Sequence, residues 1–491
     1  MNLGHKQWIW AAPAFCALGW LSCATPQAPI TSPVTLPEAF STSGSSDLPA
    51  EWWSVFEDAQ LSALVGEALE ANFSLREAWD RLDQAYATAA KSGADLWPSL
   101  DASAGFSRSV RKETGFGRTY TTSYSLGLAA DYEVDLWGKV RSARDASLYD
   151  ALATREDLHA AAMTLSAQIA YAWYQLVEQH GQIRLLDRQI QTYQEYLDVI
   201  TLKFRRGQVS ATDVLQQRQL IESTKGGRTQ VESKIRVLEH QLAVLLGRTA
   251  GRLDLEIPEV LLDPPALPKT GVPAEWVRRR PDLGAAELRV AAVDRRVAVA
   301  IGEQFPRLNL SLSAGTDAEH LRDLFDNWLA SLAANLVAPL VDGGRRRAEV
   351  WRTQAAAAAE LNRYGQVLLT AIQEVEDALA QEAKQEEYIV SLERQLVLSG
   401  QATEQTRENY TKGATEFIRF LTAQLSHQNL QRSYLQARRE RMELRIDLYR
   451  ALGGSWPLSR PGSGAEPESA EEQSDDWSGQ DPVQEESSER P

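Results

Sequence analysis

The fold of this chain is decided by residues 140–206, which read VRSARDASLYDALATREDLHAAAMTLSAQIAYAWYQLVEQHGQIRLLDRQIQTYQEYLDVITLKFRR. The stretch contains no proline and a single glycine. Its apolar residues recur at spacings of three and four, the period of one helix face. They are Leu165, Ile169, Ala172, Leu176, Ile183, Leu186, Ile190, Tyr193 and Leu197. At ~1.5 Å per residue the stretch predicts one helix of about 100 Å, a length that no compact globular domain needs.

The chain contains this pattern twice, because residues 346–412 have the same character. Landmarks repeat in one order at an offset of 206 to 208 residues. Residues 96–100 match 304–308, residues 135–139 match 341–345, residues 203–207 match 409–413, and residues 245–247 match 451–453. An internal repeat of this kind indicates a duplicated structural unit. We assign residues 58–254 to the first repeat and 255–457 to the second.

Each half predicts a medium helix, two strands, a very long helix and a second medium helix. The medium helices are expected at 61–96, 212–246 and 274–304, with a last one ending at Leu452. From their lengths we expect 212–246 to stack end to end with 274–304, and the helix ending at Leu452 with 61–96. Long helices beside such stacked pairs make a wall about 100 Å tall. Shallow helix packing favours a supercoiled cylinder, although a soluble coiled-coil rod shows the same periodicity.

Four segments alternate between apolar and polar residues in the manner of membrane barrel strands. They are residues 100–106, 124–132, 308–313 and 328–336, with interface aromatics at Tyr120, Tyr124, Tyr132 and Trp328. Amphipathic hairpins packed on a soluble core are the alternative. Four strands cannot span a membrane alone, because their open edges leave backbone groups unpaired in lipid. Three copies give twelve strands, a number that closes.

Composition excludes several other classes of protein. Of the 491 residues 43% are hydrophobic and 24% charged, and the net charge of −16 argues against binding to nucleic acid. We find no catalytic constellation, no histidine pair at metal-ligand spacing and no motif that implies a cofactor. Residues 458–491 form an acidic tail rich in Ser, Glu, Gly and Pro, a composition typical of disorder.

The N-terminus reads as an export signal. Residues 1–22 combine His5 and Lys6 with an apolar stretch from Trp8 to Leu21, which is too short for a membrane span. Ser22-Cys23-Ala24 resembles a bacterial lipoprotein cleavage site, so Cys23 is the predicted lipidation site, with a plain cleaved signal as the alternative. Residues 23–57 are then a lipid anchor followed by an extended, proline-rich strap.

Residues 45–457 resemble the outer membrane factor family, the TolC-type ducts, and especially their nodulation-T-type lipoprotein branch. The marks are Trp52-Trp53 with Phe56, Leu61 and Leu64, Asn72 before Leu75, Asp135-Leu136-Trp137-Gly138-Lys139, Arg280-Pro281-Asp282-Leu283 with Ala286-Glu287, and Phe305-Pro306. The resemblance implies a mainly α protein with a long α-helical barrel in the periplasm. Each protomer contributes four β-strands to a twelve-stranded barrel in the outer membrane.

The same resemblance implies a function and partners. The expected protein is a homotrimer and the passive exit duct of a tripartite efflux system, without catalytic activity. Small toxic compounds or drugs would reach it from an inner-membrane pump, of the resistance-nodulation-division type, through a periplasmic adaptor. The alternatives are a periplasmic coiled-coil adaptor or scaffold, and a duct for type I protein secretion or metal efflux.

The turns between the long and medium helices lie furthest from the strands, and glycine there suits a left-handed helix end. The resemblance places adaptor contacts at Arg206, Gly207, Lys412 and Gly413. It places the periplasmic gate at Thr212, Asp213, Ile418, Arg419 and Thr422. Family members often carry acidic residues at the last two positions, so Arg419 and Thr422 depart from the pattern. Asp213 and Arg419 are equivalent in the two repeats and are predicted to pair, although Thr212 and Asp213 also suit a helix N-cap.

Overall fold

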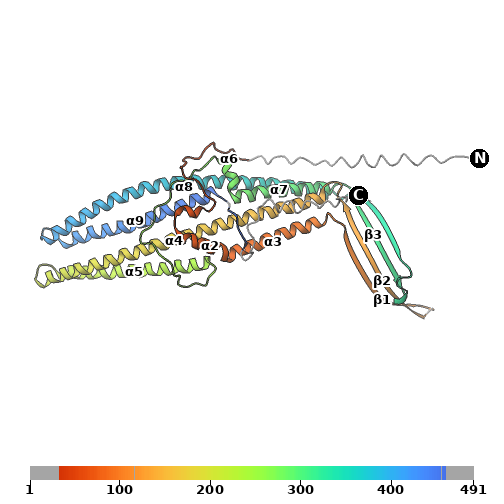
Figure 1. Cartoon of the computed structure of the whole chain (residues 1–491), viewed down its shortest axis with the longest axis horizontal. Coiled ribbons are helices and arrows are strands. Elements are labelled where there is room, and N and C mark those ends of the chain that lie inside the picture. The colour runs from red at the N-terminus through yellow and green to blue at the C-terminus, as the bar shows by residue number, and fades with distance from the viewer. Residues whose placement is uncertain (1–32, 116, 455, 461–491) are drawn as a thin grey trace, which may run out of the picture.

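The computed structural model describes residues 33–460, except 116 and 455. The predicted signal, the lipidation site Cys23 and all but the first residues of the acidic tail lie outside this range. The molecule is elongated: a sheet lies at one end of the helices and two helical hairpin tips lie at the other (Figure 1). Within the described residues, no helix combines the length and the apolar character needed to cross a membrane.

The two predicted long helices are confirmed. Helix α4 spans Lys139–Arg205 and α8 spans Arg345–Thr411, each with 67 residues. Both begin after a left-handed glycine, Gly138 with φ 70° and Gly344 with φ 85°. In the first turn of α4 the Asp135 carboxylate accepts the backbone N–H groups of Val140 and Arg141 at 3.0 Å each. This satisfies two of the donors that a helix start leaves unpaired.

The first and third medium helices are shorter than expected. Residues 61–96 divide into α2 (Ala59–Ala71) and α3 (Phe73–Ala94), because Asn72 is extended and caps the second helix through Leu75 N–H. Residues 274–304 divide into α6 (Pro273–Trp276), the 3-10 turn η3 (Val277–Arg279) and α7 (Pro281–Gly302). Pro281 at the first position of α7 stops any helix from running through. Helices α5 (Ala211–Leu245) and α9 (Phe417–Leu452) match their predictions closely.

The predicted end-to-end pairing of the medium helices is wrong. Helix α5 ends against α3 of its own half, where the Asn72 side chain donates to the Leu245 carbonyl at 2.8 Å. Helix α9 ends against α7, where Arg280 and Trp276 both donate to the Ala451 carbonyl. The similar lengths of the medium helices are compatible with either pairing. The side chain of Asn72 reaches the last carbonyls of α5, however, and those of Trp276 and Arg280 reach the last carbonyls of α9. Each half is therefore a complete unit of one long helix beside one stacked pair.

Four strands form one antiparallel sheet in the order β1-β2-β3-β4, as expected from the alternation. They span Ser99–Glu113, Gly117–Val134, Arg307–Ala318 and Leu329–Val337. Hydrogen bonding joins the two repeats, since β2 of the first half pairs with β3 of the second. The outer edges of β1 and β4 have no strand beside them within the described residues.

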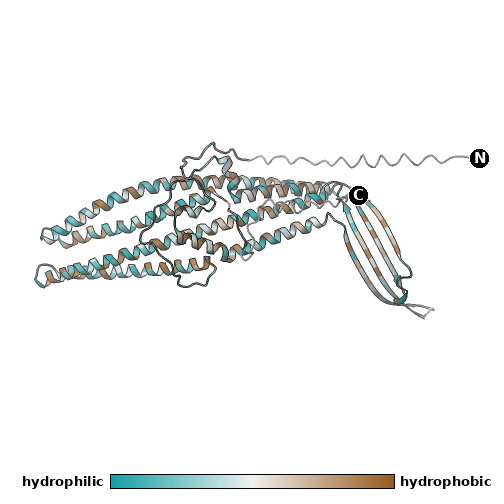
Figure 2. Ribbon diagram, viewed as in Figure 1, coloured by the Kyte–Doolittle hydropathy of each residue, from teal (hydrophilic) through white to brown (hydrophobic). Residues whose placement is uncertain are grey.

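Helix α4 lies inside the helical layer, while α8 lies at its border. Helix α4 contacts α3 and α5 on one side and α7 and α9 on the other, whereas the main helix contacts of α8 are with α7 and α9. Hydrophobic residues recur along all these helices and form bands on the strands (Figure 2). The largest core surrounds Trp52 and Trp53 of the turn η2 (Trp52–Phe56), which pack against α4 and α9. The strap residue Phe40 packs edge-on against Trp276 in a second core on α8.

Candidate functional site at the hairpin tips

Both hairpin turns have the same backbone geometry. Gly207 and Gly413 are left-handed, with φ 72° and 74°. After α4, Gln208 N–H bonds the Lys203 carbonyl and Gly207 N–H bonds the Phe204 carbonyl, at 2.9 Å each. After α8, Ala414 and Gly413 repeat this pattern one for one. This double closure is the Schellman motif, and a side chain at either glycine would strain the turn.

The helices that leave the turns begin differently. Ser210 caps α5: its Oγ accepts Asp213 N–H at 3.3 Å, and the Asp213 carboxylate accepts Ser210 N–H at 3.1 Å. This is a capping box, so the N-cap is Ser210 and not Thr212 or Asp213. Glu416 caps α9 without a side-chain bond, and Arg419 occupies the place that Asp213 has in α5. The two predicted gate residues therefore have equivalent positions, as the repeat implied.

An aromatic cluster joins the two hairpins immediately beside these helix starts. We call Tyr196, Lys203, Tyr410, Phe417 and Phe420 the tip cluster. Tyr196 of α4 packs edge-on against Phe420 of α9 at 5.0 Å, and the Tyr410 ring of α8 lies parallel to Phe420 at 6.1 Å. Lys203 Nζ lies 4.2 Å from the centre of the Tyr410 ring. The cluster thus binds the end of the first hairpin to the second through packing and a cation–π contact.

Sequence reasoning did not single out Tyr410 as a functional residue. Its hydroxyl is buried and has no hydrogen-bond partner within the described residues. Burial raises the pKa of the Tyr410 phenol, and the negative charge of Asp213 raises it further. A signal was present: Tyr410 and Phe204 are aromatic at the same place in both repeats, three residues before the glycine.

The remaining predicted gate residues are not brought together in the single chain. Thr212, Ile418, Arg419 and Thr422 are all exposed, with Ile418 at 45%. Within the described residues no ion pair joins Asp213 to Arg419. The turn residues Arg206, Gly207, Lys412 and Gly413 are exposed as well, which leaves the tips open to another molecule.

Further from the tips, α4 and α9 meet along a largely polar seam. Buried glutamines of α4 line it: Gln182 donates to the Arg432 carbonyl at 3.2 Å, and Gln189 accepts a hydrogen bond from the Arg432 guanidinium at 3.4 Å. The Tyr193 hydroxyl bonds Gln428, and Gln175 donates to Glu443 at 2.7 Å. Because directional bonds fix this seam, its register along the helices is specified more sharply than apolar packing alone would allow.

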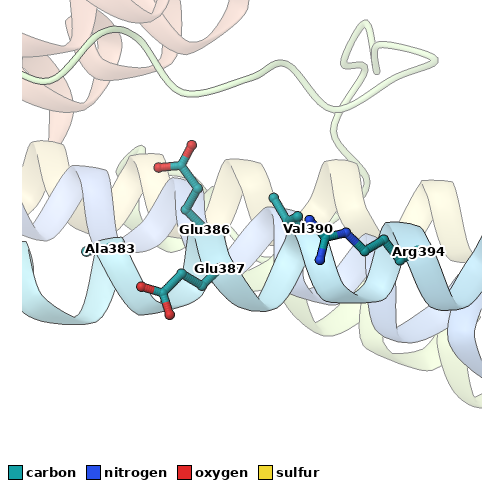
Figure 3. A pocket seen from close by; sticks show the side chains of 5 residues that line it. All are labelled: Ala383, Glu386, Glu387, Val390 and Arg394. Atoms are coloured by element: carbon teal, nitrogen blue, oxygen red, sulfur yellow. The ribbon is translucent and has the colours of Figure 1, made fainter.

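A hollow of about 480 Å³ lies on the exposed side of α8 between Ala383 and Arg394 (Figure 3). Its two carboxylates are already paired, Glu386 with Arg441 at 3.3 Å and Glu387 with Lys384 at 2.7 Å. The described residues contain no cluster of three His, Cys, Asp or Glu side chains that could hold a metal ion. The hollow offers no convergent polar groups, so we assign it no chemistry.

Comparison with known proteins gives a consistent result. A family model described as "Outer membrane efflux protein" matches residues 64–248 and 272–454. The chain is 31% identical to the pyoverdine export outer membrane protein OpmQ of Pseudomonas aeruginosa, over 90% of this chain and 96% of that protein. It is 30% identical to the toluene efflux pump outer membrane protein TtgC of Pseudomonas putida, over 88% and 91%. The solved outer-membrane channel OprN superposes with a TM-score of 0.78 at 28% identity, over 87% of this chain and 99% of that one.

Proposed function

This chain belongs to the outer membrane efflux protein family, and from that premise we propose how its parts work. It is the outer-membrane channel of a tripartite efflux system, an exit duct for compounds that an inner-membrane pump delivers. One observation carries the proposal: a four-stranded sheet, whose two outer edges have no partner strand among residues 33–460 as described, continues directly into two helices of 67 residues. The sheet is an arc of a wall, and the helices extend the same wall by about 100 Å.

The working unit is a homotrimer. Unpaired strand edges are not stable in lipid, so β4 of one copy pairs with β1 of the next, and three copies close a barrel of twelve strands. The helical layer supports the same closure, since its two borders carry exposed apolar side chains. On α8 these include Val397 and Leu398, at 61% and 65% exposure, and on α5 Leu215 and Val237, at 62% and 60%.

The partners are a periplasmic adaptor and a pump of the resistance-nodulation-division type. The adaptor meets the exposed tip turns at Arg206, Gly207, Lys412 and Gly413. Two turns of one geometry per protomer give a trimer six similar binding positions. The cargo is small organic compounds, supported by relatives whose names specify pyoverdine, toluene and antibiotics.

The tips also form the gate. Thr212, Asp213, Ile418, Arg419 and Thr422 surround the aperture, and Arg419 of one hairpin attracts Asp213 of the neighbouring hairpin. The trimer contains three copies of this ion pair, and in each protomer the tip cluster joins the two hairpins. An exposed ion pair contributes only ~0–1 kcal/mol, so the closed state is one that an adaptor can open.

The gate is tested by conductance. Arg419→Glu replaces attraction with repulsion, and its trimers are expected to conduct several times more than wild type in planar bilayers. Exchanging the charges, Asp213→Arg with Arg419→Asp, should restore the low conductance. Arg218→Glu, an exposed change on α5, serves as the control. If the Arg419→Glu and exchanged trimers both conduct like wild type, the pair does not close this channel.

The anchor proposal concerns Cys23, which we infer carries lipid and tethers the strap to the membrane. A Cys23→Ser protein should lose palmitate labelling yet still form trimers. Labelling that survives this change would rule out the assignment.

The function itself is tested by gene deletion. Loss of the gene should sensitise cells to a panel of dyes, detergents and antibiotics, and the wild-type gene should restore resistance. Outer-membrane fractions should contain a heat-resistant trimer. A protein found only in the soluble periplasm would instead support the adaptor alternative. Sensitivity confined to metal salts, or loss of a secreted protein, would support the corresponding duct alternatives.

A further inference from the structure

On strands β1 and β2, most basic residues lie on one face of the sheet and most acidic residues lie on the other. Even-numbered residues share one face across the sheet, where Leu126 faces Ala104 and Leu308 faces Leu336. This even face is the apolar one, and we take it as the lipid-facing surface. The acidic residues Asp101, Asp131 and Glu133 have odd numbers and so lie on the opposite face. Three of the four basic residues, Arg108, Lys112 and Arg118, have even numbers and so lie on the lipid-facing surface.

These three cations form one group, which we call the rim cations. Lys112 stands directly opposite Arg118 in the register, and Arg108 lies next along the same face, with its guanidinium 5.8 Å from the Tyr120 ring centre. All three side chains are exposed. Within the described residues none of them forms an ion pair with a carboxylate. Like charges directly opposite one another destabilise a strand pair, so the arrangement calls for an anion from outside the chain.

Their height along the strands places them at the membrane surface. The apolar part of the even face runs from Leu100 to Phe106 on β1, and Phe106 packs against Tyr124 at 5.2 Å. Lys112 lies twelve residues beyond Leu100, about 40 Å along a strand. A tilt of roughly 40° reduces this to about 30 Å of height, slightly more than the ~25 Å apolar band of an outer-membrane barrel. The rim cations therefore lie at the polar boundary furthest from the helices.

We propose that the rim cations bind the phosphate groups of lipopolysaccharide in the outer leaflet of the outer membrane. The inference rests on the proposed function, which puts the helices in the periplasm and the far ends of β1 and β2 at the outer surface. Lipopolysaccharide carries several phosphates on one sugar headgroup, and three adjacent cations match that charge. Arginine pairs with phosphate through two parallel hydrogen bonds, and Tyr120 supplies an aromatic surface at the same level.

Lipid binding to the purified, delipidated full-length trimer tests the proposal. Deep-rough lipopolysaccharide is titrated in detergent, and bound lipid is counted by native mass spectrometry. One surface cation near an anionic membrane is worth about 1 kcal/mol, so Lys112→Gln should weaken binding roughly fivefold and R108Q/K112Q/R118Q on the order of a hundredfold. Arg111→Gln, one residue away but on the opposite face, is the matched control and should bind like wild type.

The outcomes separate this proposal from the proposed function. Equal binding by wild type and the triple variant would overturn the site, as would equal loss in Arg111→Gln. Phosphatidylglycerol that binds as tightly as lipopolysaccharide would show a general anion surface, and complete competition by inorganic phosphate would show a free-phosphate site. The single variant Lys112→Gln decides the matter if the triple variant fails to assemble. A wild-type protein that neither forms trimers nor conducts would instead contradict the duct itself.

Discussion

At the residue scale, one buried ion pair joins the long helix α8 to the medium helix α9 in the second half. Arg445 of α9 and Glu382 of α8 have side chains only 4% and 6% exposed. Arg445 also donates to the carbonyl of Pro265, in the segment that crosses from α5 to α7. A buried charge without its partner is costly, because neither water nor the opposite charge then compensates its loss of solvation.

Arg445→Leu is therefore expected to lower the free energy of unfolding by about 3–5 kcal/mol. The double variant Arg445→Leu/Glu382→Leu should recover most of that loss, since it removes both charges. Denaturant titration of the purified protein, followed by tryptophan fluorescence, measures the difference. Arg438→Leu is the comparison, because its partner Asp263 is 81% exposed and the pair contributes little. A double variant no more stable than Arg445→Leu would show that packing, not charge, dominates here.

At the element scale, the α5–α3 junction and the α9–α7 junction are built in the same way but from different side chains. In the first half the N-cap residue of α3 reaches the last carbonyls of α5, and in the second half the N-cap residue of α7 reaches those of α9. Each contact joins two medium helices end to end. The first half uses the amide of Asn72. The second uses Arg280, which adds ion pairs to Asp282 at 2.6 Å and Glu374 at 2.9 Å. The second junction is thus tied to α8 by charge, while Asn72 contributes two neutral hydrogen bonds to the first, beside an ion pair between Arg248 and Glu67 at 2.5 Å.

Asn72→Ala should weaken the first junction by about 1–3 kcal/mol, because it removes the cap of α3 and leaves the Leu245 carbonyl without its donor. Asn72→Ser retains a capping oxygen and should lose only part of this. Thermal melting of the helical circular dichroism signal would rank the three proteins. If alanine and serine variants melt together with wild type, the end-to-end contact is held by packing alone.

At the scale of the whole molecule, the four-stranded sheet of each protomer has one apolar face and one polar face. Leu332 is apolar, 76% exposed and pairs with Leu312 on the lipid-facing surface, while the adjacent Ser331 pairs with Ser313 on the other face. The isolated chain cannot cover Leu332, but lipid can. The exposure is therefore a property of one protomer and not a defect of the fold.

Leu332→Lys should reduce assembly of heat-resistant trimers in the outer membrane, since a lysine at the lipid midplane costs about 2–4 kcal/mol. Ser331→Lys places the same charge in the aqueous lumen and should assemble normally, with altered ion selectivity. Gel analysis of outer-membrane fractions and bilayer recordings distinguish the two. Equal assembly of both variants would mean that the face assignment is reversed or that neither face meets lipid.

The sequence by itself determined the duplicated plan, both 67-residue helices, the four strands and the two glycine turns. These are local properties: helical periodicity, strand alternation and the need for glycine at a left-handed position act within a few residues. The tip residues Gly207 and Gly413 and the equivalence of Asp213 with Arg419 followed from the repeat offset alone.

Only the tertiary structure decided which helices stack and what holds the hairpins together. The stacking depends on whether Asn72 and Arg280 reach particular carbonyls, and helix length carries no information about that reach. The Ser210 cap is by contrast a local feature, because Ser210 and Asp213 have the three-residue spacing of a capping box, and Thr212 and Asp213 were the wrong candidates for the cap. Tyr410 gained its role from Lys203, Asp213 and Phe420, residues that approach it only when two distant segments fold side by side. Contacts between segments depend on shape in three dimensions, whereas periodicity records only the neighbours along one helix or strand.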